Sequence, residues 1–271
     1  MSYSEFRPQP TSSQVVKCFW TLEEDQAAYN SDEILPDSYM ELVVNFGAPL
    51  ILETERGARS EMPRIFLKGL TKKPLRLRAT GLAQLVGVRL HPWAMSNLFG
   101  IEADQANVPI IPHNGIILRD FAHALELSAQ RSDLTETIAC LQEIVSNTTR
   151  SAQVDITPIQ SAIELLYATQ GKMRMTEIAA QAYLSSSQFE RRFKRVTGVS
   201  PKTLTRLIRF EGVRNRLTVD PYASPSDLTH DFGYTDQAHL IHDFKAFANR
   251  TPGAFAASVA QQPNAEFLQY T

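Results

Sequence analysis

A short pattern occurs twice near the C-terminus, 51 positions apart, and it restricts this part of the chain to repeated short helices. In each copy an apolar pair at i and i+4 precedes a Gly or Asn, which is followed by Ser-Pro or Thr-Pro. The apolar pair seats a helix on a core, and the Gly or Asn takes the left-handed position that ends it. The hydroxyl residue and the proline then begin the next helix. The two copies are Phe189, Phe193, Gly198, Ser200-Pro201 and Leu240, Phe244, Asn249, Thr251-Pro252.

Upstream of each copy the sequence predicts a second short helix and a tight turn. These helices cover 176–182 and 226–232, and the turns are Tyr183-Leu184-Ser185 and Gly233-Tyr234-Thr235. A short helix, a turn and a second helix with a polar outer face form a helix-turn-helix. We therefore expect two such units, at about 175–197 and 226–248, joined by a long helix from Pro201 to about Leu217. Two units indicate a protein that reads two adjacent stretches of DNA.

The charge is unevenly distributed along the chain, although the whole carries only −2. Residues 1–150 hold 14 Lys+Arg and 18 Asp+Glu, which gives −4. Residues 172–216 carry +8, whereas residues 217–271 carry −4. Phosphate contacts need a basic surface, so the sequence predicts that the first unit binds DNA more strongly than the second.

The predicted recognition helices begin near Ser185 and Asp236, and Ser185 with Gln188 forms a capping box. Arg pairs with guanine and Gln with adenine in the major groove, while hydroxyls and helix N-termini suit phosphates. The alternative, a merely solvated polar face, is much weaker inside a duplicated unit. A metal site at His230, His239 and His242 is rejected because the pattern offers no third ligand position. The predicted DNA contacts are Ser186, Ser187, Gln188, Arg191, Arg192, Arg195, Gln237, Ala238, His239, His242 and Lys245.

The first 118 residues are predicted to form short β-strands, with turns at proline and glycine positions. The expected strands cover 15–20, 42–46, 50–52, 64–67, 75–78 and 85–90. Strands at this spacing are typical of a sandwich or small barrel. The fold class is therefore α+β, with an N-terminal β-sandwich or small barrel and trailing helices, and a C-terminal all-α domain.

The periodicity becomes helical after Pro112, with faces formed by Phe121, Leu125 and Ala129 and by Leu134, Ile138, Leu141 and Val145. Trailing helices are expected near 119–146. The polar stretch 147–153 predicts a boundary between a regulatory domain, 1–150, and a DNA-binding domain, 151–271. A helix beginning with Thr157 as its N-cap and ending at Gly171 is expected to pack against the first unit.

Residues from about 158 to 259 resemble the DNA-binding domain of AraC/XylS-family transcription regulators. The resemblance rests on ordered motifs over about 100 residues, and it implies two helix-turn-helix units that read successive major grooves. Three positions depart from the family pattern: Tyr183 replaces the usual turn glycine, Gly212 interrupts the linker helix, and His242 replaces a common arginine. The matching stretches are 176–179, 187–194, 198–201, Arg209-Phe210, 232–240 and Phe244-Lys245.

The N-terminal half more loosely resembles the β-barrel sensor domain of one branch of these regulators, through the stretches 17–20, 35–47 and 87–92. In the family such barrels bind a small effector or mediate dimerisation. Ordinary structural roles as core aromatics, a turn aspartate or strand-face charges are equally compatible with the candidates. The candidate ligand contacts are Trp20, Asp37, Glu41, Arg89 and Trp93.

The leading interpretation is a transcription regulator without enzymatic activity, cofactor or metal. Its expected partners are double-stranded DNA, a small-molecule effector and RNA polymerase, and it is expected to be a cytoplasmic monomer or homodimer. Two alternatives remain: an enzyme (cupin-like or alkyl-transferring) fused to a DNA-binding module, and a small-molecule-binding module with a dimerisation bundle. The first alternative requires a His-rich strand motif, which is absent, or a reactive thiol. Cys18 and Cys140 are expected to be buried thiols rather than a disulfide.

Overall fold

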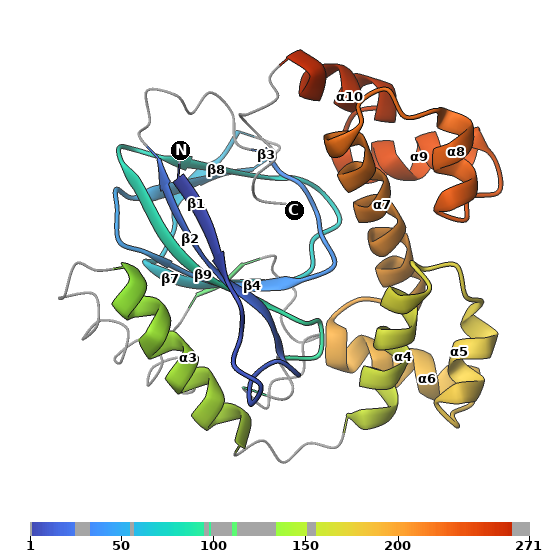
Figure 1. Ribbon diagram of the computed structural model, residues 1–271, viewed down its shortest axis with the longest axis horizontal. Helices are drawn as coiled ribbons and strands as arrows, with labels where there is room; N and C mark the ends of the chain where they lie inside the picture. The colour runs from blue at the N-terminus through green and yellow to red at the C-terminus, as the bar shows by residue number, and fades with distance from the viewer. Residues whose placement is uncertain are drawn as a thin grey trace.

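The computed structural model describes residues 2–24, 33–54, 57–94, 98, 110–112, 134–150 and 156–261. Its described part consists of a β-rich half and an all-helical half, which lie side by side (Figure 1). The expected fold class is confirmed. The predicted helices around Phe121, Leu125 and Ala129 lie outside the described residues.

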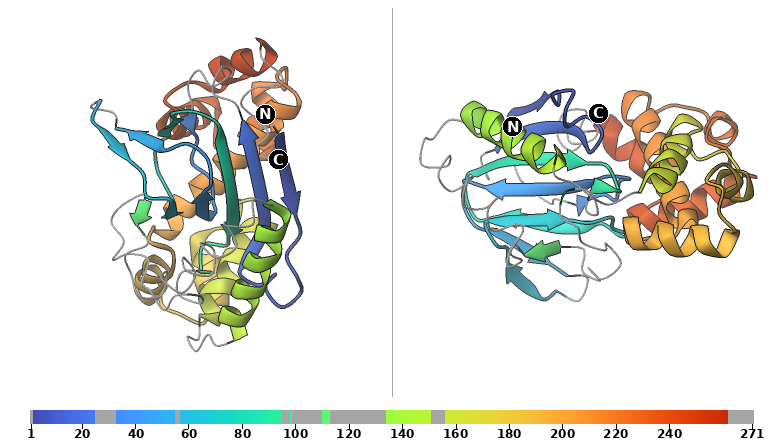
Figure 2. Two further views of the ribbon diagram at one scale, coloured as in Figure 1. Left: turned by 90° about the vertical axis from the view of Figure 1, so that its left-hand side faces the viewer. Right: turned by 90° about the horizontal axis from the view of Figure 1, so that it is seen from below.

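The β-rich half contains two antiparallel sheets, which are separated into layers in Figure 2. The larger sheet has the order β1-β2-β9-β4-β7-β10, and the smaller has the order β3-β8-β5-β6. The six strands expected from the sequence correspond to β2, β4, β5, β7, β8 and β9. The strands are β1 (Ser2–Phe6), β2 (Val16–Glu24), β3 (Glu33–Ile34), β4 (Met40–Asn45), β5 (Leu50–Glu53), β6 (Arg59–Glu61), β7 (Ile65–Lys68), β8 (Leu75–Ala79), β9 (Ala83–Leu90) and β10 (Ile110–Pro112).

Both faces of the larger sheet are buried, which explains the apolar runs in its central strands. Along β2, Cys18, Trp20 and Leu22 belong to the core between the two sheets, whereas Phe19 belongs to the core on the other face. That second face is covered by α3 (Leu134–Arg150), whose buried Leu141 and Val145 join the same core as Phe19. The predicted helix over this segment is confirmed. It continues to Arg150, so the first part of the expected polar break is helical.

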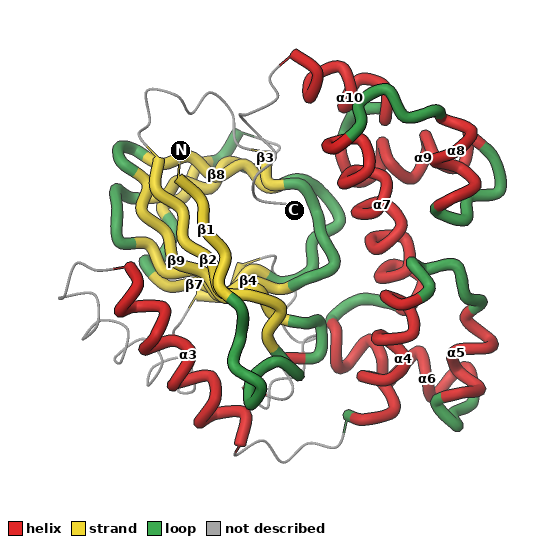
Figure 3. The backbone as a smooth tube through the Cα atoms, in the orientation of Figure 1, coloured by secondary structure: helices red, strands yellow, loops and turns green. Residues whose placement is uncertain are grey.

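The helical half contains seven helices among the described residues, and α7 runs through its centre (Figure 3). The prediction that Thr157 is an N-cap is wrong by one residue. Ile156 occupies that position without a side-chain cap, because Thr157 and Pro158 already belong to the first helical turn. The helices are α4 (Thr157–Ala168), α5 (Met175–Gln181), α6 (Ser186–Thr197), α7 (Pro201–Val219), α8 (Pro225–Asp231), α9 (Gln237–Ala248) and α10 (Pro252–Gln261).

The helical half is built on two buried clusters that meet along α7. Phe189, Phe193 and Leu204 belong to a cluster that continues through α4 into the β-rich half. Phe210, Phe244 and the helices α8–α10 form the second cluster, which takes in Leu35 from the β-rich half. The long helix α7 therefore holds one helix-turn-helix unit near each of its ends (Figure 1).

Candidate nucleic-acid interface

The first predicted recognition helix, α6, begins and ends as its sequence indicates. The Ser185 hydroxyl accepts a hydrogen bond from the Gln188 backbone N–H, and the Gln188 side chain accepts one from the Ser185 N–H. At the other end Gly198 adopts a left-handed conformation, with φ of 78°. Phe189, Phe193 and Val196 are buried. All six residues predicted to contact DNA are exposed: Ser186, Ser187, Gln188, Arg191, Arg192 and Arg195.

The second predicted recognition helix, α9, repeats these features with different residues. Asp236 caps it by accepting a hydrogen bond from the His239 N–H at 2.8 Å, and Asn249 ends it with φ of 55°. Gln237, Ala238, His242 and Lys245 are exposed as predicted. His239 is half-buried: its ring packs edge-on against Tyr234, and its Nε2 lies 3.7 Å from the Asp243 carboxylate. Of the five candidates on α9, His239 is thus the one held partly inside the protein.

Two arginines of α7 that add to the positive charge of the first unit bind other groups of the protein. Arg206 of α7 donates to the buried carboxylate of Asp243 on α9 at 2.8 Å, and it also packs over the Phe247 ring. Arg209 donates to the Gly171 carbonyl. These arginines count toward the +8 of the first unit, but their guanidinium groups bind other groups of the protein. The basic surface available to phosphates is therefore smaller than the sequence suggests, and it centres on α6.

The turns between the helices have the same backbone geometry and differ in the residue at one position. Both turns contain a residue in the left-handed conformation, Tyr183 with φ of 53° and Gly233 with φ of 67°. An equivalent backbone hydrogen bond closes each turn. Leu184 N–H donates to the Ala179 carbonyl in the first turn, and Tyr234 N–H donates to the Thr229 carbonyl in the second. The glycine expected in the first turn is therefore replaced by a tyrosine that adopts the glycine conformation, which is strained for an L-residue.

Gly212 has a packing role that its sequence position did not reveal. It lies in the interior of α7, where its missing side chain leaves room for the Phe232 ring of the second unit. A Cβ at this position would lie 2.4 Å from Phe232 Cε1 and 2.6 Å from Cδ1. Gly212 therefore does more than interrupt the pattern of the linker helix, because it allows close contact between α7 and the second unit.

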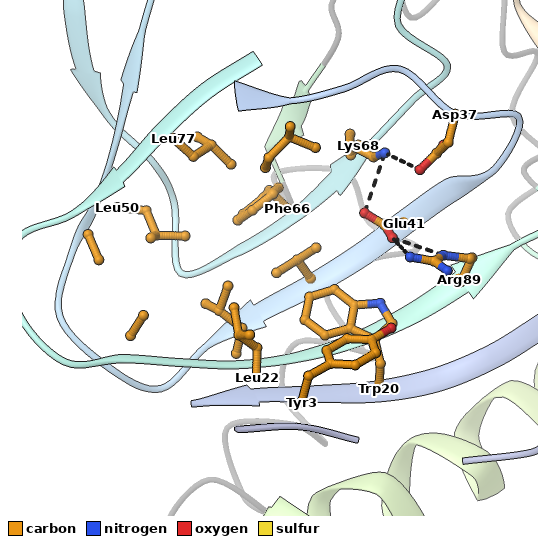
Figure 4. A pocket seen from close by; sticks show the side chains of 15 residues that line it. Tyr3, Trp20, Leu22, Asp37, Glu41, Leu50, Phe66, Lys68, Leu77 and Arg89 are labelled. Carbon is orange, nitrogen blue, oxygen red and sulfur yellow. Dashed lines mark hydrogen bonds and ion pairs between the residues drawn. The ribbon is translucent and has the colours of Figure 1, made fainter. Parts of the chain in front are cut away.

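Four of the five candidate ligand contacts line one pocket between the two sheets: Trp20, Asp37, Glu41 and Arg89 (Figure 4). Trp93 is not among the lining residues. Its ring stacks on His91 with centroids 4.5 Å apart, and its Nε1 donates to the Gln14 carbonyl. Trp93 is therefore explained by packing.

Sequence reasoning missed Lys68, whose ammonium lies 3.1 Å from Asp37 Oδ2 and 3.4 Å from Glu41 Oε2. Burial opposes ionisation of Asp37, but the cations Lys68, Arg89 and Arg214 and the Tyr39 backbone N–H together outweigh it and lower the pKa of that carboxyl. The sequence signal was present, because Lys68 follows Phe66 at the two-residue period of one strand face.

The segment Leu35–Tyr39 connects this pocket to the helical half. Asp37 faces Lys68 in the pocket, while the residues on either side of it contact α4 and α7. Ser38 donates through its backbone N–H to Glu211, and its carbonyl accepts from the Tyr167 hydroxyl at 2.7 Å. The Pro36 carbonyl accepts from the buried guanidinium of Arg214. Sequence periodicity cannot reveal these contacts, since their partners lie more than a hundred residues apart.

The two cysteines are free thiols. Cys18 is buried as expected, and burial raises the pKa of its thiol to about 12. Cys140 is half-buried, which differs from the expectation that both thiols would be buried. Within the described ranges, no three His, Cys, Asp or Glu side chains come together as a set that could hold a metal ion. None of the described helices combines the length and apolar character needed to cross a membrane.

In comparisons with known proteins, the β-rich half and the helical half match different families. A helix-turn-helix domain family matches residues 178–258, and a domain of unknown function, DUF6597, matches residues 4–110. No curated protein sequence matches the chain.

Several solved structures are similar at low sequence identity, and they include the following three. ToxT from Vibrio cholerae is 12% identical, with 88% of this chain and 98% of that chain covered and a TM-score of 0.48. The DNA-binding domain of AdpA, solved in complex with a target DNA, is 22% identical, with 40% and 97% covered and a TM-score of 0.38. An AraC-type regulator from Chromobacterium violaceum is 24% identical, with 39% and 94% covered and a TM-score of 0.36. Residues 178–258 of this chain therefore contain a helix-turn-helix domain, and they follow a domain that matches DUF6597 over residues 4–110.

Proposed function

We propose that this protein is a sequence-specific transcription regulator, not an enzyme, whose two helix-turn-helix units read adjacent major grooves of double-stranded DNA. The observation that carries the proposal is the presence of two recognition helices, α6 and α9, on one linker helix, each with a side-chain N-cap and a left-handed C-cap. A bundle used only for dimerisation would not require exposed Arg191 and Arg192 on α6. The buried, protonated thiol of Cys18 disfavours the alkyl-transfer alternative.

The proposed base and phosphate contacts follow from exposure and chemistry. On α6, Arg191 and Arg192 form no ion pair with any described residue, so their guanidinium groups are available for guanine or phosphate. Gln188 already accepts hydrogen bonds through its Oε1, which leaves its amide N–H groups to donate. On α9, Gln237, His242 and Lys245 make the corresponding contacts, and His239 contributes less because of its burial.

The spacing of the two units supports binding on one face of the duplex. The 19 residues of α7 span about 28 Å at 1.5 Å per residue. Recognition helices that read successive major grooves lie about 34 Å apart, one helical turn of DNA. The helices flanking α7 supply the remaining separation, and a modest bend of the DNA toward the protein would accommodate a difference.

We further propose that the N-terminal half regulates DNA binding, with 1–150 and 151–271 as its regulatory and DNA-binding domains. The segment Leu35–Tyr39 supports this proposal because it contacts the pocket through Asp37 and α7 through Pro36 and Ser38. A change in the pocket would therefore reach the helix that sets the separation of the two units. A small-molecule effector is the proposed signal, and RNA polymerase is the proposed partner in activation.

The experiment that tests the DNA proposal is selection of genomic fragments by the purified full-length chain, followed by hydroxyl-radical footprinting on the selected site. We expect two protected patches on one face of the duplex, one helical turn apart. Protection of a single patch by the intact protein would contradict the two-unit reading. A failure to enrich any fragment at low salt would contradict sequence-specific DNA binding itself.

A further inference from the structure

The pocket between the two sheets has an apolar part and a charged part (Figure 4). Leu22, Leu50, Phe66 and Leu77 line the apolar part, and the charged part contains Asp37, Glu41, Lys68 and Arg89. Its cavity volume is about 60 Å³, several times what a single water molecule needs. The shape and lining suit a molecule with an apolar body and a polar group at one end.

The charged part is electrically balanced without a ligand. Asp37 and Glu41 share Lys68, and Glu41 Oε1 accepts from Arg89 at 3.2 Å. The four side chains are between 4% and 11% exposed, so solvent screens them little. Glu5 lies 3.6 Å from Arg89 and adds a further negative charge at the edge of this group. A ligand carboxylate would be an additional buried anion without a cation to neutralise it.

One hydrogen-bond donor in the pocket lacks a partner. The indole nitrogen Nε1 of Trp20 is buried and has no acceptor among the described residues. In Figure 4 it lies on the edge of the ring nearest the charged side chains. A buried N–H without an acceptor is costly, and such groups normally find a partner. The site therefore offers a donor to whatever occupies it.

The backbone opposite Trp20 is shaped for this ring. Trp20 pairs with Gly87 across β2 and β9, and a Cβ at Gly87 would lie 2.0 Å from Trp20 Cε2. The glycine lets the indole lie directly against β9 and fixes the position of Nε1 beside the pocket. The Tyr3 ring covers the indole with centroids 6.2 Å apart, while the Tyr3 hydroxyl donates to Glu5.

We propose that this pocket binds an uncharged, largely apolar molecule that carries a carbonyl or ether oxygen, and that this oxygen accepts a hydrogen bond from Trp20 Nε1. Charge balance excludes a carboxylate, the apolar lining takes the body of the molecule, and the unpaired indole N–H selects for the acceptor. The proposal deepens the regulatory function given above by naming the chemical class of the effector. The binding itself does not depend on the proposed regulatory function; only the expected effect of the ligand on DNA binding rests on it.

Three probes with one ring and one alkyl tail separate the contributions: para-butylacetophenone, para-butylbenzoate and para-butylethylbenzene. They carry an uncharged acceptor, a carboxylate and no polar group, respectively. Calorimetric titration of the full-length chain at neutral pH should find the ketone bound about threefold to tenfold more tightly than the hydrocarbon, the worth of one hydrogen bond. The benzoate should bind at least about tenfold more weakly than the ketone.

The variant Trp20→Phe keeps an aromatic ring but removes the donor, so the ketone should lose its advantage over the hydrocarbon. Trp93→Phe is the matched control, because Trp93 lies outside the pocket and its Nε1 is already bonded. It should keep the ketone preference. Circular dichroism verifies that both variants are folded.

Tighter binding of the benzoate, equal binding of ketone and hydrocarbon to the unaltered protein, or no binding of any probe would overturn the proposal. A DNA titration with and without the ketone is measured separately. Ketone binding in a protein without DNA affinity would leave the pocket assignment intact and contradict the regulatory function. DNA affinity without ketone binding would contradict the pocket assignment and leave DNA binding intact.

Discussion

The two helix-turn-helix units have capped recognition helices and the same turn geometry, but they differ in what surrounds them. The first unit presents exposed Arg191 and Arg192, and its core is continuous with that of the β-rich half. The second unit presents His242 in place of an arginine, and it has a core of its own that takes in, of the described residues of the β-rich half, Leu35 alone.

This difference suggests separate roles for the two units, one in the affinity for DNA and the other in the position of the second contact. The first unit is attached to the β-rich half through α4, where Tyr167 stacks on Tyr39, and it carries most of the basic surface. The second unit is attached through α7, by the Gly212–Phe232 contact and the Arg206–Asp243 ion pair. We infer that the first unit anchors the protein on DNA and that the second sets where the neighbouring groove is read.

The largest expected effect comes from Gly212→Ala, which should break the attachment of the second unit alone. The new methyl group would occupy the space of the Phe232 ring, so we expect a loss of about 3 kcal/mol in the free energy of unfolding, the upper end for overpacking. Urea unfolding measures the loss, and footprinting should show a weakened second patch with the first retained. Gly253→Ala in α10 is the control, since nothing lies within 4 Å of its added Cβ. Equal loss of both patches would contradict separate attachment.

Arg191→Ala and His242→Ala compare the two recognition helices directly. The arginine variant should cost about 1–3 kcal/mol of DNA-binding free energy and relax one base position, as expected for a bidentate contact. The histidine variant should cost less. Both are measured on a selected site at fixed salt, with the exposed Arg216→Ala of α7 as a control. A larger loss for His242→Ala would reverse the assignment of the anchoring unit.

Acidification should loosen the side of the molecule on which the first unit is attached. Burial lowers the pKa of His91 to about 4, and its ring contacts Tyr39 and Tyr167 at this attachment. Because the unfolded chain binds this proton near its ordinary value of 6.5, the stabilisation is complete above that pH and is lost as the pH falls toward 4. Between pH 7 and pH 5 the expected loss is about 2 kcal/mol, at 1.36 kcal/mol per pKa unit.

Unfolding curves at the two pH values measure the loss for the unaltered protein and for His91→Asn, which should lose most of this dependence. His230→Asn is the control, because that ring is 92% exposed. If the stability of His91→Asn depended on pH as strongly as that of the unaltered protein, His91 would not be the group responsible.

The smallest effect concerns the two turns. Tyr183→Gly should stabilise the first unit by about 1 kcal/mol, because a left-handed L-residue is strained by 1–2 kcal/mol and part of the gain is lost to backbone entropy. The Tyr183 side chain is 96% exposed, so little packing is lost. Tyr222→Gly, at an exposed position without positive φ, should not stabilise. Thermal unfolding distinguishes the two variants, and a destabilised Tyr183→Gly would show that the tyrosine has a role beyond the turn.

The sequence alone determined the local structure of both units. Caps, turn positions and apolar faces are set by neighbours within a few residues, so the pattern from Phe189 to Pro201 and its repeat placed α6, α9 and the start of α7 correctly. The alternating strands were predicted for the same reason. The edge strands β1, β3 and β6 were missed, because partly exposed edges lack a strong apolar period. The three-residue edge strand β10 was missed as well.

Only the tertiary structure decided which distant residues meet. Gly212 has the sequence of a weak helix position and becomes a contact surface because Phe232 folds onto it. The connection from the pocket to α7 is formed by Lys68, Asp37 and Arg214. More than a hundred residues separate Arg214 from the other two. Trp93 and Trp20 are alike in sequence, yet the fold gives one an acceptor and leaves the other with a free donor in the pocket. The physical reason is that caps and periods act along the chain, whereas charge pairing and close packing depend on surfaces that exist only after the chain has folded.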